Sequence, residues 1–221
     1  MQFQVPPNTT ILGVGSEAKL VEGYLSLNTM SQTFGQTENS NIIIRNVTFE
    51  APRDFAPAWD GSDGASGNWN ARYDAISINA SNHIWIDHCS FSDGEHFDKD
   101  EPVIFGKHIQ RHDGLLDIED DSDYITLSYN VFSNHDKTMI IGSGDSDAGD
   151  YRITFEGTYG KTAPSALPGY ALAKCICSIT IIRGLPMPII PSLMRLAWGI
   201  SHLFFQKVMC LIFRAVVQQK I

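Results

Sequence analysis

Apolar residues in the first 156 residues recur in short runs rather than in long amphipathic stretches. Each run is about three residues long and contains Ile or Leu, and Gly, Asn, Asp and Ser cluster between the runs. Short apolar runs bounded by turn formers are typical of β-strands, and no segment sustains a helical period. The predicted strands contain Thr10–Leu12, Ile42–Ile44, Ile84–Ile86, Ile125–Leu127 and Arg152–Thr154.

Three of these runs begin a longer repeat, in Asn41–Phe49, His83–Phe91 and Tyr124–Phe132. Each repeat has an apolar–x–apolar segment, then a few mostly polar or small residues, then Phe. The repeats start about 41 residues apart, which leaves room for long loops between strands. This pattern favours an all-β solenoid in which stacked coils bury Ile, Val and Phe against one another. A β-sandwich also has short strands and is the alternative.

Charge divides the chain at Glu156. All 25 Asp and Glu lie at or before this residue, against 9 of the 16 Lys and Arg, so residues 1–156 carry −16 and residues 157–221 carry +7. The second segment has no Asp, Glu or Asn and holds three of the four cysteines. Its apolar stretch is interrupted by prolines and arginines, which leaves no uninterrupted span of about 20 apolar residues for a membrane helix. We therefore predict a β-solenoid portion over 1–156 and an irregular tail over 157–221.

The net charge of −9 argues against nucleic acid as an electrostatic partner. A polyanionic substrate stays compatible with it, because a bound divalent cation inverts the local field. Cys89 is the only cysteine before the tail, so that portion has no internal disulfide framework. The residues after Met1 have neither a basic start nor an apolar run, so no signal peptide is visible. Either the protein is cytosolic or the sequence starts inside a longer gene, and we expect the second.

Three carboxylates are candidate metal ligands. Asp74 precedes one predicted strand, and Asp113 and Asp117 flank another. On neighbouring coils of a solenoid these three could converge, and hard oxygen ligands at that density suit calcium. Without a cation they would repel and raise one another's pKa. The alternative is that all three are solvated loop acids.

Other polar residues give weaker signals. The acidic run formed by Glu119, Asp120, Asp121 and Asp123 is expected to be solvated, because it lacks the spacing of an EF-hand. Lys137 follows one coil later and could bind a substrate carboxylate as a point charge, although a surface pair with Asp136 is the simpler expectation. The histidines His88 and His112 each stand beside an Asp and are expected to be structural hydrogen-bond donors rather than bases.

The ordered set of motifs resembles the pectate lyase family of right-handed parallel β-helices, over roughly residues 5–155. The motifs that carry the resemblance are Trp85–Phe91, His112–Gly114, Ser128–Asn130 and His135–Lys137 through Gly142–Ser146, and Trp59–Asp60 with Gly67–Asn70 is similar to the bacterial branch.

The resemblance implies a secreted, monomeric enzyme that cleaves polygalacturonate by calcium-assisted β-elimination, with no nucleic-acid or membrane partner. Motif by motif, Asp74, Asp113 and Asp117 fall on calcium-ligand positions, and Lys137 falls on a substrate-binding lysine. The implied role of Ca²⁺ is to stabilise the enolate-like transition state that forms when the proton on C5 leaves. The family's base is an arginine in an R-x-P-R-x-R-F-G-like motif expected shortly after Phe155, and no such motif stands in this sequence.

A shift of reading frame accounts for the missing motif. One permissible set of codons for Pro164–Lys174, read from the last base of the first codon, encodes ERAPRVRFGK, which is the expected motif. Codons chosen in the same way from His202 onward encode SIFSEGNVFD. We therefore predict that the frame slips between Phe155 and Gly157, that the tail is not selected as protein, and that the chain as written has lost its catalytic arginine and has little or no lyase activity.

Two alternatives to an active pectate lyase remain at this stage. A catalytically inactive chain could still bind acidic polysaccharide through calcium. A pectin lyase, which acts on methylated substrate, would not need the three calcium acids, so Asp74, Asp113 and Asp117 count against it.

Overall fold

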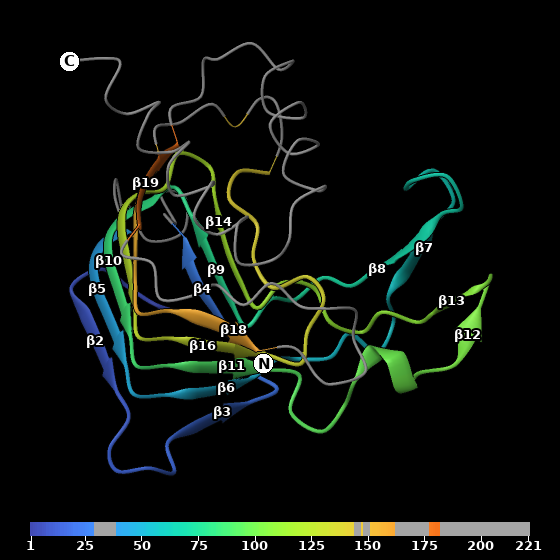
Figure 1. Ribbon diagram of the computed structural model, residues 1–221, viewed down its shortest axis with the longest axis horizontal. Helices are drawn as coiled ribbons and strands as arrows, with labels where there is room; N and C mark the ends of the chain where they lie inside the picture. Colours follow the sequence, from blue (N-terminus) through green and yellow to red (C-terminus); the bar gives the residue numbers. More distant parts are fainter. Residues whose placement is uncertain (29–38, 144–146, 148–150, 162–176, 182–221) are drawn as a thin grey trace, which may run out of the picture.

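The computed structural model describes residues 1–28, 39–143, 147, 151–161 and 177–181. Its strands form three long sheets that run along the sides of one stack (Figure 1). The first sheet, sheet A, contains β1 (Gln2–Gln4), β4 (Tyr24–Asn28), β9 (Ile76–Asn79) and β14 (Leu116–Glu119). Sheet B contains β2 (Thr9–Leu12), β5 (Asn39–Arg45), β10 (Ser81–Asp87), β15 (Asp123–Ser128), β17 (Tyr151–Glu156) and β19 (Cys177–Ile181). Sheet C contains β3 (Lys19–Val21), β6 (Thr48–Glu50), β11 (Ser90–Ser92), β16 (Val131–Ser133) and β18 (Tyr159–Lys161).

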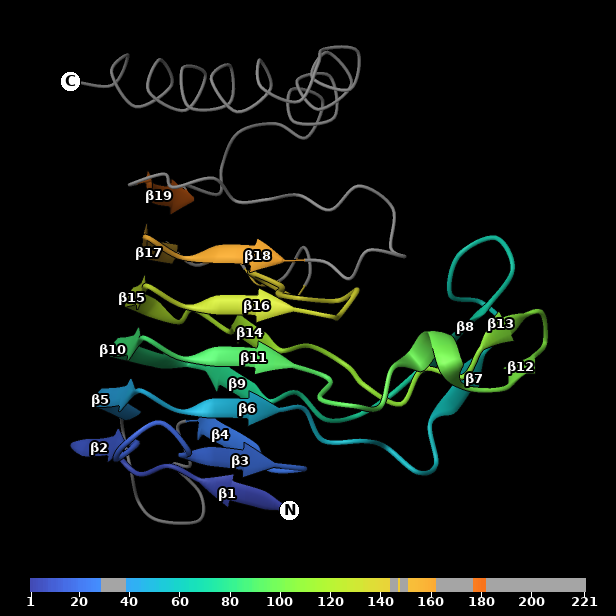
Figure 2. The same cartoon turned by 60° about the horizontal axis from the view of Figure 1, so that its bottom comes forward.

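Each coil supplies strands to the sheets in turn, and successive coils pair in parallel. In sheet B, Ile42, Ile84 and Ile125 lie beside one another in register, followed by Ile153. Figure 2 shows the strands of sheet C as stacked layers. The all-β parallel β-helix predicted from the repeats is therefore confirmed, and the β-sandwich alternative is wrong. Among the described pairs of these three sheets, the pairing of β17 with β19 is antiparallel.

The repeated phenylalanines form a column inside the stack. Phe49, Phe91 and Phe132 occupy matching positions of sheet C, and their rings stack with centroids 4.8 Å apart at both steps. Phe49 and Phe91 are almost completely buried. Offset aromatic pairs contribute about 0.5–1.5 kcal/mol beyond their buried area. This column explains why Phe recurs at the same place in each repeat.

The corner between sheets B and C has the same backbone conformation in successive coils. Asn46, His88 and Tyr129 there have φ of 57°, 51° and 52°, and Gly157 follows with φ 57°. A Cβ at Gly157 would press against the ring of Tyr129. Glycine therefore suits this corner both because φ is positive and because there is no room for a side chain. The described coil thus continues past Glu156 into β18. Most of the predicted irregular tail, residues 157–221, lies outside the described residues.

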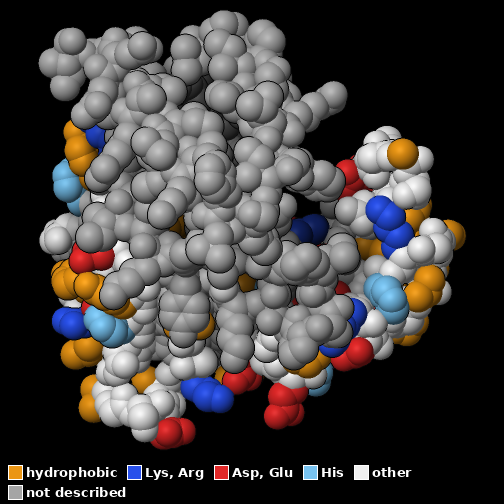
Figure 3. Space-filling view, viewed as in Figure 1, with side chains coloured by type: hydrophobic (Ala, Val, Ile, Leu, Met, Phe, Trp, Pro, Cys, Tyr) orange, Lys and Arg blue, Asp and Glu red, His pale blue; other side chains and the backbone are white. Residues whose placement is uncertain are grey.

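Two long insertions project from one side of the stack and form an arm. The first, between β6 and β9, contains the antiparallel hairpin β7 (Ala58–Asp60) and β8 (Asn68–Asn70), and the second, between β11 and β14, contains the 3₁₀ helix η1 (Asp98–Asp100) and the hairpin β12 (Val103–Ile104) and β13 (Lys107–His108). Rings of Trp59, Trp69 and Phe105 pack together, with centroids 4.9 to 5.9 Å apart, and join the two hairpins. Figure 3 shows hydrophobic side chains on this arm beside histidine and basic ones. In the described part of the chain, no helix has the length and apolar character needed to cross a membrane.

Candidate functional site

The arm returns to sheet A at two acidic residues. Asp74 stands two residues before β9, and Asp113 stands three residues before β14. Because β9 and β14 pair in parallel, with Ile76 beside Leu116, the two returns lie next to each other. Asp117 follows within β14, where it alternates with the buried Leu116 and Ile118 and therefore faces outward.

Gly114 lies between two of the predicted ligands. Its backbone N–H donates a hydrogen bond of 2.9 Å to Oδ1 of Asp74. A Cβ added to Gly114 would overlap the carboxylate of Asp117, so the absence of a side chain here leaves the space that this carboxylate occupies. Asp117 Oδ1 also accepts a hydrogen bond of 3.0 Å from the N–H of Ile140.

The two carboxylates beside Gly114 have raised pKa values. Burial, and then repulsion by Asp117, raise the pKa of Asp74 to about 8, against a smaller opposing effect of the Gly114 N–H. Burial also raises the pKa of Asp117 to about 6; the Ile140 N–H lowers it, and repulsion by Asp113 and Glu119 raises it further. Such shifts mean that both carboxylates are partly removed from solvent and lie among acidic neighbours.

Lys137 points to the predicted ligands rather than to its neighbour in the chain. Its Nζ lies 3.4 Å from Oδ1 of Asp113. The expected pairing with Asp136 is wrong, because Asp136 is exposed and instead accepts a hydrogen bond of 3.3 Å from Gln110. Stacking of successive coils brings Lys137, which lies after β16, beside Asp113, which lies before β14. A cation and the acid cluster therefore share one surface.

The predicted ligand set is only partly assembled. Asp74 and Asp117 meet around Gly114, whereas Asp113 turns to Lys137. Over residues 1–28, 39–143, 147, 151–161 and 177–181, no three Asp, Glu, His or Cys side chains form a group that could hold a metal ion as they stand. The donor chemistry nevertheless fits calcium, since the oxygens are carboxylates, their charge is unbalanced, and Gly114 has no side chain that would displace the Asp117 carboxylate.

Sequence reasoning missed one member of this acidic surface. Glu119 was grouped with the solvated run, but it alternates with Ile118 in β14 and lies on the same face as Asp117. It is partly buried, accepts a hydrogen bond of 3.0 Å from Asn79, and contributes to the raised pKa of both Asp74 and Asp117. The alternation Leu–Asp–Ile–Glu was the signal that could have found it. Asp120 and Asp121 are exposed, as expected. The expectation of a solvated Asp123 is wrong, because its side chain is only 14% exposed and forms an ion pair with Arg152.

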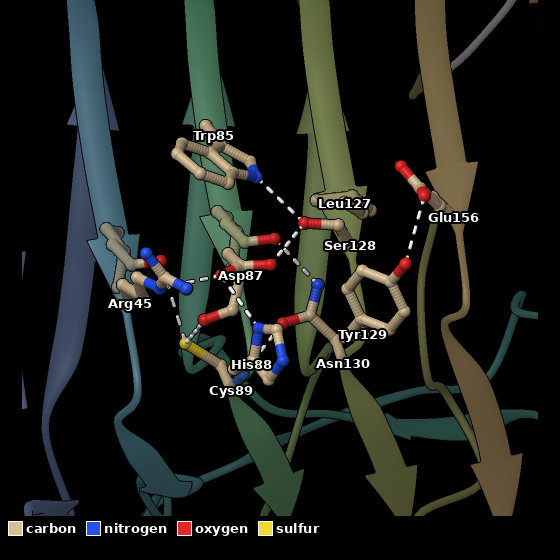
Figure 4. A network of polar contacts seen from close by, with 12 residues as sticks. Arg45, Trp85, Asp87, His88, Cys89, Leu127, Ser128, Tyr129, Asn130 and Glu156 are labelled. Carbon is tan, nitrogen blue, oxygen red and sulfur yellow. Dashed lines mark hydrogen bonds and ion pairs between the residues drawn. The ribbon is translucent and has the colours of Figure 1, made fainter.

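The Trp85–Phe91 motif lies at a different place, around the C-terminal end of strand β10 in sheet B (Figure 4). Asp87 is buried there and accepts hydrogen bonds from Ser128 of the next coil and from His88, at 2.7 Å in the latter case. Arg45 of the preceding coil contributes an ion pair of 2.8 Å. Trp85 completes the network by donating to Ser128 Oγ at 2.8 Å. The network ties three coils together, and His88 is a structural hydrogen-bonding group, as predicted.

His112 is also held structurally, but not by the Asp beside it. Its Nδ1 lies 2.8 Å from Oδ1 of Asp98, a residue of η1. A second histidine, His135, stands nearby with Nδ1 2.6 Å from Asp93. The sequence pointed to His135 only as part of a motif and did not point to Asp93 or Asp98, because only the fold brings the three segments together.

Comparison with known proteins identifies the chain's relatives. The family model described as pectate lyase matches residues 1–166, which is most of the chain. The chain belongs to the pectate lyase family. The resemblance inferred from the motifs is thereby confirmed.

Individual relatives agree with this assignment. A pectate lyase of Bacillus subtilis (strain 168) is 46% identical over 157 residues, covering 70% of this chain and 35% of the relative. Pectate lyase E of Dickeya chrysanthemi is 41% identical over 158 residues, covering 70% of this chain and 38% of the relative. The chain thus spans little more than a third of the length of these curated pectate lyases.

Solved structures share the fold as well as the sequence. The thermostable pectate lyase PL 47 superposes with a TM-score of 0.67 at 47% identity, over 72% of this chain and 37% of that one. A pectate lyase bound to a hexasaccharide superposes with a TM-score of 0.66 at 41% identity, over 74% of this chain and 40% of that one. The β-helix described here therefore corresponds to a part of larger pectate lyases.

Proposed function

We propose that this chain is the calcium- and pectate-binding portion of a secreted, monomeric pectate lyase, with little or no catalytic turnover in this form. Asp74, Asp113 and Asp117 hold Ca²⁺, and Lys137 binds a carboxylate of α-1,4-polygalacturonate. The observation that carries the proposal is the pair of partly buried, uncompensated carboxylates of Asp74 and Asp117 around Gly114, with Lys137 beside the neighbouring Asp113. The substrate class follows the family and the hexasaccharide bound by a relative.

The reaction proposed for the complete enzyme is β-elimination. A proton leaves C5 of a galacturonate unit and the glycosidic oxygen leaves C4, which produces an unsaturated oligogalacturonide. When bound, Ca²⁺ supplies positive charge to the uronate carboxylate and stabilises the enolate-like transition state. Lys137 orients the same class of carboxylate through its ammonium group, which its position beside Asp113 allows. The aspartates remain ionised once a divalent cation balances their charge.

The base for this elimination is the group that the chain lacks. In the family it is an arginine after the segment that corresponds to β17, and the sequence from Gly157 onward contains no R-x-P-R-x-R-F-G-like motif. Acidity at C5 is weak, so binding without a base gives no useful rate. We therefore assign no catalytic residue to this chain.

Two measurements on the full chain test the proposal. Calorimetric titration with trigalacturonate is expected to show binding in calcium and none after chelation with EDTA. Incubation with polygalacturonate and calcium is expected to give no rise in the ultraviolet absorbance of unsaturated products. Robust product formation would contradict the loss of activity, whereas equal binding with and without calcium would contradict the metal site.

The frame shift has its own test at the level of DNA. We propose that the reading frame slips between Phe155 and Gly157, so that a one-base correction near the codon for Glu156 restores ERAPRVRFGK. Expression of the corrected gene is expected to yield lyase activity that chelation abolishes. A corrected frame that does not encode the motif would remove this explanation for the tail, while leaving calcium-dependent binding to be judged by calorimetry.

The second candidate function is a pectin lyase. It would act on methylated polygalacturonate without calcium. The acidic cluster counts against it, because a carboxylate cluster of this kind offers nothing to a neutral ester without a cation. Titration of methylated and unmethylated oligosaccharides separates the two candidates: the proposed function requires preference for the unmethylated form.

A further inference from the structure

Two histidines with buried side chains adjoin residues of the proposed site, and each contacts a carboxylate. The His112 side chain is 1% exposed and the His135 side chain 0%. Their rings are perpendicular, with centroids 6.2 Å apart. Nδ1 of His112 lies 2.8 Å from Oδ1 of Asp98, and Nδ1 of His135 lies 2.6 Å from Oδ1 of Asp93.

Both carboxylates come from the one loop that leaves β11 and enters η1. Asp93 joins the two halves of the cluster, because its Oδ2 also lies 3.9 Å from Nδ1 of His112. Asp98 also contacts the backbone: its carboxylate accepts hydrogen bonds from the N–H of Arg111 at 3.0 Å and from the N–H of His112 at 3.3 Å. One loop therefore holds two segments that are distant in the sequence.

The two held segments are the ones that carry site residues. His112 directly precedes Asp113, and His135 stands two residues before Lys137. Asp113 and Lys137 are themselves in contact at 3.4 Å. Neither residue is deeply buried, with about a third of each side chain exposed, so surface packing alone does not set their separation. The buried histidines connect the two segments a second time, through their contacts with Asp93 and Asp98.

The polar atoms of the cluster indicate more than packing. Nε2 of His112 and Nε2 of His135 are buried and have no hydrogen-bond partner among the described protein atoms. Leaving such a group unpaired costs about 1–3 kcal/mol, whereas an apolar side chain of similar size would avoid that cost. Stability alone thus gives little reason to place two imidazoles here, while their Nδ1 groups have directional hydrogen bonds that an apolar side chain cannot make.

We infer that His112 and His135 are positioning residues that, through Asp98 and Asp93, hold Asp113 and Lys137 at the separation needed to bind calcium and a uronate carboxylate together. This inference rests on the proposed function of the same site. Neither histidine touches substrate in this arrangement, and each acts through the backbone that leads to the site residue. Supporting residues of this kind are worth about 10–100-fold in metal affinity where they have been removed from metal sites.

A matched pair of amide variants separates positioning from packing. In His135→Asn the side-chain nitrogen occupies about the place of Nδ1 and can still donate to Asp93, whereas in His135→Gln it lies near the place of Nε2 and cannot. The two amides are alike in chemistry and both are neutral. Calorimetric titration with trigalacturonate at saturating calcium is expected to show H135N within about threefold of the unmodified chain and H135Q weakened by about 10-fold or more.

Stability is measured on the same variants by urea unfolding. Positioning predicts that the affinity follows the placement of the donor even where both variants lose similar stability. Equal affinity of H135N and H135Q, after correction for the folded fraction, would overturn the inference and leave the cluster a purely structural element. His83→Gln, at an exposed histidine of sheet B, is the control and is expected to leave binding unchanged.

Amide hydrogen exchange gives a second readout, which requires neither a ligand nor folded histidine variants. The amides of Gly114 and Ile140 donate to Asp74 and Asp117, so their hydrogen exchange reports the local geometry directly. Asp93→Asn is expected to speed exchange at both amides while the amide of Val131, which donates to Cys89, is unchanged. Unchanged exchange at Gly114 and Ile140 would overturn the inference. If the unmodified chain binds neither calcium nor trigalacturonate, the proposed function fails, and this exchange experiment still decides the positioning role.

Discussion

Two regions of this β-helix differ in how the charge of their aspartates is balanced. At the end of sheet B, Asp87 receives an arginine, a histidine and a serine hydroxyl from its own and neighbouring coils. At the return of the arm to sheet A, Asp74 and Asp117 each accept a hydrogen bond from one backbone N–H, and among the described residues neither forms an ion pair with a positively charged group. The same fold thus holds one compensated and one uncompensated acidic cluster.

The pKa values express the same contrast. Burial alone would raise the pKa of Asp147, but hydrogen bonds from the Tyr151 hydroxyl and from backbone N–H groups, including that of Ser143, outweigh it and lower the pKa to about 2. Asp74, with fewer donors and acidic neighbours, has a pKa of about 8. A carboxylate whose charge is stabilised by donors of the protein contributes to the stability of the fold. A carboxylate with few donors and acidic neighbours is free to bind a cation. The comparison therefore supports the proposed site with an argument that does not depend on any relative.

Asp117→Asn is the strongest test of the uncompensated cluster. The change keeps the shape of the side chain and removes one ligand charge, so calcium-dependent trigalacturonate binding is expected to fall by roughly 100-fold. The free energy of unfolding without calcium is expected to stay equal or to rise, because a repulsive charge is removed. Calorimetry and urea unfolding measure the two quantities. Asp136→Asn, at an exposed acid nearby, is the control, and an equal loss of affinity there would show that the effect is general charge screening.

Asp87→Asn is expected to give the reverse result. The amide cannot accept from all of the partners of Asp87, and the charge of Arg45 loses its counterion, so the free energy of unfolding falls by about 2–3 kcal/mol. Calcium-dependent binding by the folded fraction is expected to be unchanged. Urea unfolding with Asp63→Asn, an exposed acid of the arm, supplies the reference. Loss of binding without loss of stability in D87N would break the contrast between the two clusters.

Gly114→Ala tests the uncompensated cluster by filling the volume next to the Asp117 carboxylate while leaving its charge unchanged. The new methyl group overlaps the Asp117 carboxylate and displaces it, so calcium-dependent binding is expected to weaken by about 10-fold. Gly61→Ala in the arm is the matched control, because the nearest atom to its Cβ lies at 3.8 Å, an ordinary contact. Calorimetry on both variants decides the point. Unchanged affinity in G114A would mean that the space beside Gly114 is not part of the site.

The pH dependence of stability tests the compensated side of the comparison, at Asp147. Its pKa is about 2 in the folded protein and near 4 in an unfolded chain, so the folded state binds fewer protons between these values. The contribution of Asp147 to stability is therefore complete above about pH 4 and is lost as the pH falls toward 2. Asp147→Asn is expected to cost about 2 kcal/mol at pH 5 and progressively less in acid. A difference from the unmodified chain that stays constant from pH 5 to pH 2 would contradict this assignment.

Much of the architecture could be predicted from the sequence because it depends on repetition. Ile42, Ile84 and Ile125 recur at a near-constant spacing, and Phe49, Phe91 and Phe132 follow them, so stacked coils are the arrangement that buries all six in columns. The family resemblance then pointed to Asp74, Asp113, Asp117 and Lys137. Asp113 and Lys137 stand in the quoted motifs His112–Gly114 and His135–Lys137, and Asp74 and Asp117 lie next to predicted strands, so their positions could be assigned from the chain itself.

The tertiary structure alone decided which polar groups face one another. Lys137 turned out to contact Asp113 rather than Asp136, Glu119 joined the acidic face, and Asp93 and Asp98 gripped two histidines from later coils. Such contacts join residues that lie about 14 to 42 positions apart in the chain, and their geometry depends on the path of the arm as well as on the register of the coils. Composition and periodicity specify which face a side chain takes, because that depends on the local backbone. The partner it meets there is set by the stacking of distant segments, and the chemistry of this site depends on those partners.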